Sequence, residues 1–387
     1  MNLTPKQLTQ VLDNAITQHG LNKVLEIILN CLMKLERDEF LKVSTCKNKA
    51  NGYRFGRAFG FGSELKLQIP RDRLGQFYPI LLTLIKSQEA ELQNLAFILY
   101  SKGLSVRDVS DVFDKIYGSS YSKSSISRIN QNFVEEMMIW RNRELEAFYP
   151  TLMIDALYTK VRRSNKVELE AIYTVIALKD DMTRDIIAIE NIPQESAAGW
   201  EIIFRNLKER GVEKVNLIIA DGLTGLEQSV AKIFPNTKLQ KCVTHFKRNI
   251  LKRVRNSHKA EIAEDLRKVF ITNDSSLSKK DGIANLSIFI SKWEKQYNFI
   301  RRYKSRTDIL YYFTYLEYDY RIRSMIYTTN WIEALNKQFR RVLKIRNSMP
   351  SDESVLLLIT KIAMDKVEKY LQYPVYNFKF DQKLINE

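Results

Sequence analysis

The feature that most constrains the fold is a change in the spacing of apolar residues near Pro150. Three β-rich runs follow, "TLMIDALYT", "VELEAIYTVIALK" and "DIIAIEN", joined by short polar turns. Strands linked this closely form an antiparallel meander. The chain continues as an amphipathic helix, a buried strand, a second helix and a short strand, at residues 196–211, 215–222, 225–235 and 238–242. This order predicts the α/β fold of an RNase H-like domain, in which the first and fourth strands are neighbours.

The rest of the chain reads as mainly helical. Residues 256–320 lose the strand pattern and predict an all-helical insertion. The first forty residues read as amphipathic helices, and the Gly-, Arg- and aromatic-rich residues 46–77 predict a small β or loop module with a basic face. We therefore expect five parts, of which the third and fifth form the α/β core: residues 1–64, 65–146, 147–255, 256–320 and 321–387.

A helix-turn-helix is predicted within residues 65–146. The segments "LSVRDVSDVFDKIYG" and "SSYSKSSISRINQNFVEEMMIW" meet at a Gly-Ser turn, and the second opens with small polar residues. In a DNA-binding helix-turn-helix the second helix enters the major groove, so Lys123, Ser125 and Arg128 would face DNA. Helical hairpins with a polar second helix are also common in proteins that do not bind DNA, and both interpretations stay open.

The charge of the chain favours a polyanionic partner. Its 387 residues include 61 Lys and Arg against 45 Asp and Glu, a formal net charge of +16. Cations that neutralise phosphates release condensed counterions, which drives binding to nucleic acid. A solvated basic surface is the alternative, but here the cations cluster in pairs: Arg162-Arg163, Lys247-Arg248, Lys252-Arg253, Arg301-Arg302 and Arg340-Arg341.

Cysteine usage and hydropathy predict a cytoplasmic protein with no membrane partner. Cys31, Cys46 and Cys242 form no CxxC pair, which is typical of a reducing compartment. The first residues lack a signal-peptide core, and the longest apolar runs are too short to span a bilayer.

Two aspartates interrupt apolar strands. Asp155 lies inside "LMIDAL", where an unpaired buried carboxylate is so costly that it needs a partner or a metal. Asp221 ends "VNLIIADG", and its alternative role as a helix cap is already offered by Thr224 with Glu227. In the predicted strand order the two aspartates lie side by side, where their like charges need a cation. Two hard oxygen ligands at a sheet edge suit Mg²⁺ or Mn²⁺.

A third carboxylate, Glu333, lies in the basic segment "IYTTNWIEALNKQFRRVLKIR". One explanation is local: Asn330 caps the helix, Glu333 completes a capping box, and Lys337 pairs with it. The helical period gives another, because it predicts a buried face made of Ile332, Leu335, Phe339 and Val342. Glu333 then begins the adjacent stripe, which continues with Lys337, Arg340 and Lys344. If the apolar face docks on the sheet, Glu333 completes a site for two metal ions and the basic residues hold DNA.

Cys242 and His245, in "QKCVTHFKRN", also suggest zinc. Tetrahedral zinc needs four ligands, and the other cysteines and histidines form no second close pair. We therefore expect Cys242 and His245 to pack and hydrogen-bond beside the carboxylates.

Several of these segments resemble the bacterial insertion-sequence transposases of the Mutator-like superfamily, which are DDE transposases. The matching segments are "IDALYTKVR", "IIADGLTGLEQSVAKIFPNTKLQKCVTHFKRN" and "IYTTNWIEALNKQFRRVLKIRNSMPSDES", with looser matches in "PRDRLGQFYP" and "YSKSSISRI". The resemblance implies that Asp155, Asp221 and Glu333 form a catalytic triad that binds two Mg²⁺ or Mn²⁺ ions. It also implies cleavage of the ends of the element and their joining to target DNA, and we expect two or more copies of the protein to assemble there.

The remaining site residues are assigned by role. We expect supporting roles for Cys242, His245, Asn330 and Asn336. DNA contacts are expected from Lys123, Ser125, Arg128, Arg162, Arg163, Lys247, Arg248, Lys337, Arg340, Arg341 and Lys344. Two other functions stay open: a transposase-derived DNA-binding protein without catalysis, and an RNase H-like nuclease or resolvase that only hydrolyses. Hydrolysis and strand transfer use the same metals, and only the resemblance favours transfer.

Overall fold

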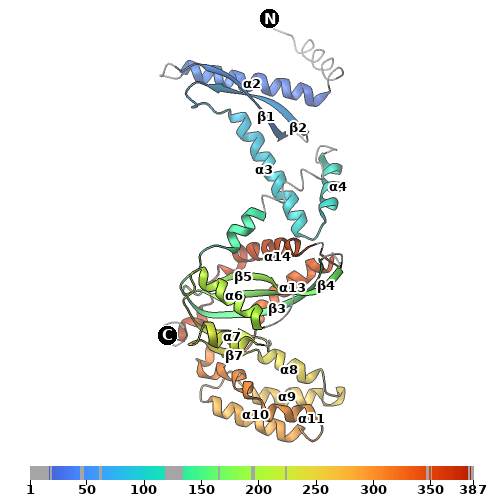
Figure 1. Cartoon of the computed structure of the whole chain (residues 1–387), viewed down its shortest axis with the longest axis vertical. Helices are drawn as coiled ribbons and strands as arrows, with labels where there is room; N and C mark the ends of the chain where they lie inside the picture. The colour runs from blue at the N-terminus through green and yellow to red at the C-terminus, as the bar shows by residue number, and fades with distance from the viewer. Residues whose placement is uncertain are drawn as a thin grey trace. The chain divides into compact units, whose positions relative to one another are not determined.

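The structure is a computed structural model. It describes residues 17, 20–43, 48–60, 63–117, 134–163, 166–192, 197–222, 225–345, 348–349, 351–381 and 384. The chain divides into two compact units, residues 1–133 and 134–387, and each is described by itself (Figure 1).

The first unit contains the predicted β module, which is a hairpin. Strands β1 (Ala50–Gly60) and β2 (Ser63–Asp72) pair antiparallel. The other elements of the unit are helices α2 (Leu21–Val43), α3 (Ile80–Ser101) and α4 (Val106–Tyr117). The hairpin crosses the division expected between residues 64 and 65. The second helix expected for the helix-turn-helix, with Lys123, Ser125 and Arg128, lies outside the described residues.

One face of the hairpin is buried. It packs on apolar side chains of α2 and α3, and the cluster is made of Leu29, Met33, Ala58, Leu65, Leu67, Ile69, Leu82 and Ile85. Helix α2 also covers the outer edge of β2, because its Glu26 carboxylate accepts from the Lys66 N–H and its Asn30 side chain accepts from the Gln68 N–H, both at 2.8 Å. The strand edge is thereby closed to further pairing.

The second unit is built around a five-stranded sheet in the order β5-β4-β3-β6-β7. The strands are β3 (Phe148–Arg163), β4 (Lys166–Leu178), β5 (Arg184–Ile192), β6 (Lys214–Ala220) and β7 (Lys238–Lys241). β3, β4 and β5 pair antiparallel, whereas β6 runs parallel to β3, and β7 runs parallel to β6. The predicted strand order and the adjacency of the first and fourth strands are confirmed.

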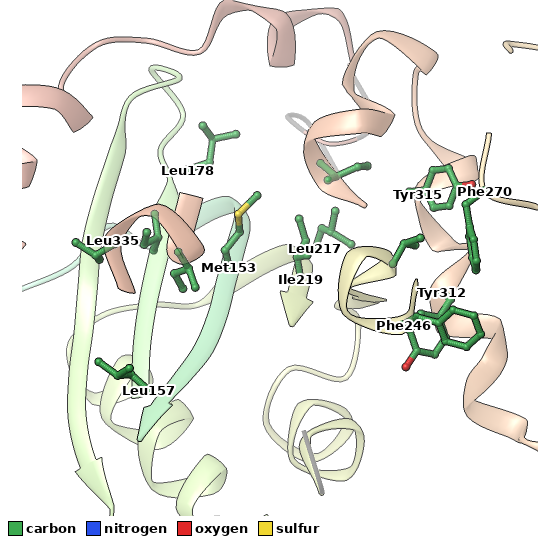
Figure 2. Packing of buried hydrophobic residues seen from close by; sticks show 14 of the residues in the cluster. Met153, Leu157, Leu178, Leu217, Ile219, Phe246, Phe270, Tyr312, Tyr315 and Leu335 are labelled. Carbon is green, nitrogen blue, oxygen red and sulfur yellow. The ribbon is translucent and has the colours of Figure 1, made fainter. Parts of the chain in front are cut away.

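Side chains of β3 alternate between two cores. Leu152 and Ile154 point to the face covered by α6 (Ala197–Glu209) and α7 (Leu226–Ile233). Met153 and Leu157 point to the opposite face, toward Leu335 of α13 (Asn330–Ile345), as Figure 2 shows. Helix α14 (Asp352–Lys366) joins the same core, followed by a π-helical turn (Val367–Leu371) and a 3₁₀ turn (Tyr376–Phe380).

The segment between β7 and α13 is helical, as predicted. It contains α8 (Val243–Leu251), α9 (Lys259–Val269), α10 (Lys279–Trp293), α11 (Asn298–Arg301), α12 (Tyr320–Ile326) and 3₁₀ turns at Asn256–His258, Arg302–Ser305, Thr307–Tyr312 and Thr314–Glu317. Gln240 of β7 anchors it to the sheet, because its side chain accepts from the Tyr315 N–H at 2.6 Å and donates to the Tyr312 carbonyl at 3.3 Å. The buried Lys241 ammonium adds an ion pair with Asp308 at 2.7 Å. In the part of the chain that the structure describes, no helix has the length and apolar character that crossing a membrane requires.

Candidate active site at the ends of the central strands

Three neighbouring strands bring the first site residues to one level of the sheet. β3 and β6 run parallel with Ile154 opposite Ala220, and β7 continues this register on the other side of β6. The next residues along the chain are Asp155 in β3 and Asp221 after β6. After β7 comes Cys242, whose N–H donates to the Ala220 carbonyl at 2.7 Å. Two carboxylates and a thiol therefore lie at the same level of the sheet, Asp155 within β3 and the other two just after β6 and β7.

Asp155 faces the core that α13 covers, and it is buried. The Asn336 side-chain amide of α13 donates to Asp155 Oδ2 at 2.8 Å. Burial raises the pKa of Asp155, and the nearby charge of Asp221 acts in the same direction. Asn336 is only 1% exposed, and its amide oxygen finds no hydrogen-bond partner among the described residues. Asn336 thus holds one carboxylate oxygen of Asp155 through its amide nitrogen, while its amide oxygen stays buried.

The segment before α13 is fastened to the start of α8. The Val243 N–H donates to the Tyr327 carbonyl at 2.9 Å, and the Thr244 hydroxyl lies 3.1 Å from that of Thr328. The Thr329 hydroxyl contacts Cys242 Sγ at 3.5 Å. These contacts fix residues 242–244 against residues 327–329, and so set the position of His245 relative to Glu333.

His245 lies between two of the carboxylates. Its Nδ1 is 3.6 Å from Asp221 Oδ1, and its Nε2 is 3.7 Å from Glu333 Oε1. A hydrogen bond with Cys242 and the charges of Asp221 and Asp155 raise the pKa of His245 to about 9, although burial opposes this. The ring is therefore protonated at neutral pH and offsets the negative charge of the site.

Glu333 is held by an arginine of α8. Arg248 Nη1 and Nη2 donate to Glu333 Oε1 and Oε2 at 2.9 and 3.0 Å, a bidentate pair. The expected capping box is wrong, because α13 begins at Asn330 and the Glu333 N–H donates to the carbonyl of Thr329 at 2.9 Å. Glu333 therefore lies one position beyond the expected one, and its carboxylate points to α8. The Asn330 side-chain oxygen instead accepts from the Thr328 hydroxyl at 3.0 Å.

One cluster of potential metal ligands shares a single residue, Glu333, with the expected set of Asp155, Asp221 and Glu333. Ligand atoms of Cys242, His245 and Glu333 all lie within 4.8 Å of one another, and this is the only such group of three among the described residues. Sequence reasoning paired Cys242 with His245 and rejected zinc for want of further ligands. It missed Glu333 as the third member, because Glu333 is 88 positions from His245 and no local pattern links them.

The predicted DNA contacts fall into distinct surroundings. Lys337, Arg340, Arg341 and Lys344 are exposed along α13, and Arg162 is exposed on β3. Lys247 is half-buried between the rings of Phe270 and Tyr327, at 5.4 and 5.8 Å from their centroids. Nothing is described for the side chain of Arg163. The expected cap residue Thr224 also lies outside the described residues, and Glu227 forms an ion pair with Lys241.

The buried face of α13 was predicted closely. Ile332, Leu335 and Phe339 are buried, and Val342 is half-buried. Asn336 is buried with them. The sequence assigns Asn336 a supporting role, and the structure gives it Asp155 as its hydrogen-bond partner.

Comparisons with known proteins agree along most of the chain. A family model described as "Transposase, Mutator family" matches residues 3–373. The chain is 30% identical over 370 residues to a transposase for insertion sequence element IS905 of Lactococcus lactis subsp. lactis, covering 93% of this chain and 90% of the relative. It is 28% identical over 388 residues to the transposase for IS256 in transposon Tn4001 of Staphylococcus aureus, covering 98% of each.

Among solved structures, the strand transfer complex of the Drosophila P element transposase aligns with 76% of this chain and 84% of that chain, at 12% identity and a TM-score of 0.29. A similarity this low does not define the fold.

Proposed function

The chain belongs to the Mutator family of transposases, and we propose that it binds the terminal inverted repeats of its insertion sequence, cleaves the DNA ends and joins each 3′-hydroxyl to target DNA. The observation that carries this proposal is the arrangement around His245. Asp221 and Glu333 flank its ring at 3.6 and 3.7 Å, and Asp155 lies on β3, the strand next to the one that Asp221 follows.

The sheet topology supports the same reading. Three antiparallel strands followed by two parallel ones, in the order β5-β4-β3-β6-β7, match the strand order expected of an RNase H-like core. In this arrangement the carboxylates come from the middle of β3, the end of β6 and the first turn of α13. Positions on a sheet and a packed helix give the fixed geometry that a catalytic site needs.

The residues present fit a divalent cation. Carboxylate oxygens are the ligands that Mg²⁺ and Mn²⁺ prefer, and the buried amide oxygen of Asn336 adds a polar group whose partner is not among the described residues. Asp155, Asp221 and Glu333 would hold the ions. When bound, two such ions activate the attacking oxygen and stabilise the leaving oxygen of a phosphoryl transfer.

The Arg248 side chain competes with a metal ion for Glu333. It donates to both carboxylate oxygens, and its positive charge opposes a cation beside them. The Arg248 side chain is half exposed, and a DNA phosphate offers it an equally bidentate partner. We therefore expect Arg248 to exchange Glu333 for the DNA backbone, which couples DNA binding to the assembly of the site.

The remaining basic residues have a positioning role in this proposal. Lys337, Arg340 and Lys344 continue from Glu333 along the exposed side of α13. Contacts of such side chains with phosphates fix the register of the DNA without reading its sequence. Because an element has two ends, we expect at least two copies of the chain to act together on DNA.

The direct test uses the purified full-length protein, Mg²⁺ and duplex DNA carrying the inverted repeats that flank its reading frame. Asp155→Asn, Asp221→Asn and Glu333→Gln should each abolish cleavage and joining and leave DNA binding largely intact. Near-wild-type activity of Glu333→Gln would remove Glu333 from the triad.

The products separate the alternatives. Joined molecules with a target plasmid support strand transfer, whereas nicked or cut DNA without joined products would identify a nuclease. Binding without any cleavage by the wild-type chain would identify a DNA-binding protein that lacks catalysis.

A further inference from the structure

We propose that the outward face of the β1–β2 hairpin is a DNA-reading surface, which enters the major groove of the element ends. We call this surface the open face and define it by Phe55, Arg57, Lys66 and Gln68. The identity of the DNA rests on the proposed function. The surface itself is defined by the structure of the first unit alone.

The open face follows from the pleat of the hairpin. Side chains alternate between the two faces of a strand, and Ala58, Leu65 and Leu67 point into the core with α2 and α3. Their neighbours therefore point outward, and Phe55 is 81% exposed. This is the largest exposed fraction among the large hydrophobic side chains of the described residues, so contact with a partner would bury more apolar surface here than at any other such ring.

The pairing across the open face is unfavourable in the free protein. Arg57 lies directly opposite Lys66, and Phe55 lies opposite Gln68. Like charges that face each other across an antiparallel pair destabilise it. Glu64 relieves part of this cost through a 3.4 Å ion pair with Arg57, whose side chain is still 74% exposed. An anionic partner would attract both Arg57 and Lys66 and so offset the repulsion between them.

The charge of the surrounding segment points to a polyanion. Residues 48–73 contain six Lys and Arg against two acidic residues. One of the acidic residues, Asp72, is buried, and its carboxylate accepts hydrogen bonds from the Asn48 side chain at 2.7 Å and the Gln76 and Phe77 N–H groups at 3.0 and 3.1 Å. The Asp72 carboxylate is therefore occupied by hydrogen bonds within the fold. It neutralises little of the positive charge that the Lys and Arg side chains present to solvent.

The shape of the module selects duplex DNA. The major groove is about 12 Å wide and admits a two-stranded β-ribbon. Helices α2 and α3 support the hairpin from behind, and Glu26 and Asn30 of α2 fix the edge of β2. The side chains of the open face suit base edges: Arg57 and Lys66 for guanine, Gln68 for adenine and Phe55 for the methyl group of thymine.

The experiment compares two duplexes of equal length, one with the element-end sequence and one scrambled, at a fixed salt concentration. Fluorescence anisotropy measures binding of the full-length wild type and of the Phe55→Ala and Gln68→Ala variants. Each variant should bind the end sequence about tenfold more weakly and leave affinity for the scrambled duplex within about twofold. Leu35→Ala and Lys34→Gln on α2 are matched controls, since both side chains are exposed on a different element.

Three results would overturn the inference. Both variants could bind the two duplexes as the wild type does, or they could lose both affinities equally, which would make the open face a non-specific contact. A changed molecular mass in solution with unchanged DNA binding would assign the face to a second copy of the chain. Circular dichroism confirms folding, and Gln68→Ala keeps the test valid should Phe55→Ala fail to fold. The wild type could bind the end sequence selectively through Phe55 and yet show no strand transfer. That result would support this inference and contradict only the proposed function.

Discussion

Charged side chains at the candidate active site and on the open face of the hairpin have opposite surroundings. At the strand ends each carboxylate has a partner: Asn336 for Asp155, His245 for Asp221 and Arg248 for Glu333. On the hairpin, like charges face each other and an aromatic ring is left in water. In our two proposals, the groups assigned to chemistry are held by polar or charged partners within the protein. The groups assigned to recognition stay largely exposed, and Arg57 has only its ion pair with Glu64, so that DNA supplies the further contacts.

The largest expected effect is on metal affinity when the hydrogen bond from Asn336 to Asp155 is removed. Asn336→Ala removes the donor that holds Asp155, and losses of this kind typically cost about 10- to 100-fold in metal affinity. Mn²⁺ binding to the DNA-free protein, followed by electron paramagnetic resonance, measures it. Gln338→Ala, an exposed position on the same helix, should leave Mn²⁺ affinity unchanged. Equal affinities for Asn336→Ala and wild type would show that Asp155 needs no support, and the contrast with the hairpin would weaken.

The basic stripe of α13 sharpens the distinction between holding DNA and reading it. Replacing Lys337, Arg340 and Lys344 with Ala should weaken binding about tenfold for end and scrambled duplexes alike. The slope of log affinity against log salt should fall by about one unit for each lost phosphate contact. Titrations at several salt concentrations measure both. A loss confined to the end sequence would mean that these side chains read bases, as we propose only for the open face.

Replacing Arg248 tests whether its ion pair with Glu333 weakens metal binding. Arg248→Gln removes the cation that competes for both Glu333 oxygens. An exposed ion pair of this kind contributes up to about 1 kcal/mol, so the DNA-free variant should bind Mn²⁺ about fivefold more tightly. Isothermal titration calorimetry gives the affinity, and Arg253→Gln, at an exposed position two residues beyond the end of α8, is a control outside the site. Weaker Mn²⁺ binding by Arg248→Gln would mean that the arginine organises Glu333 and does not block it.

The smallest expected effect is on stability alone. Burial, with a contribution from Arg267, lowers the pKa of Lys247 from 10.5 to about 8. Below pH 8 the folded protein therefore keeps a charge that its surroundings disfavour, and the penalty fades as pH rises toward 10.5, where the unfolded chain also loses the proton. Lys247→Met should raise the free energy of unfolding by about 1 kcal/mol at pH 7, with the gain shrinking above pH 8.

Urea unfolding of both proteins between pH 7 and 10 measures this difference. DNA affinity of Lys247→Met should stay near that of the wild type, in contrast to the stripe on α13. A strong loss of DNA binding would restore the phosphate contact first expected of Lys247.

Local patterns in the sequence determined the order of the elements along the chain and the faces that they bury. The period of the apolar residues predicts three strands, a helix and a fourth strand, and the RNase H-like order that this succession indicates puts Asp155 and Asp221 on adjacent strands, as observed. It also identified the buried face of α13 and the basic β module. These features depend on backbone geometry, which repeats every two residues in a strand and every 3.6 in a helix, so a single segment contains the information.

The partners of the site residues were decided only by the tertiary structure. The sequence offers Glu333 either its own helix cap or a metal site, whereas the contact between α8 and α13 pairs it with Arg248, 85 positions away. It also assigns Asn336 a supporting role, but only the structure identifies Asp155, 181 positions away, as its partner. Such pairs depend on how a helix packs on the sheet. Shifting a helix by one turn would give its residues different partners, although the local sequence pattern would be the same. The sequence by itself therefore determined which carboxylates are present and on which elements they lie, and the packing of those elements decided how each one is held.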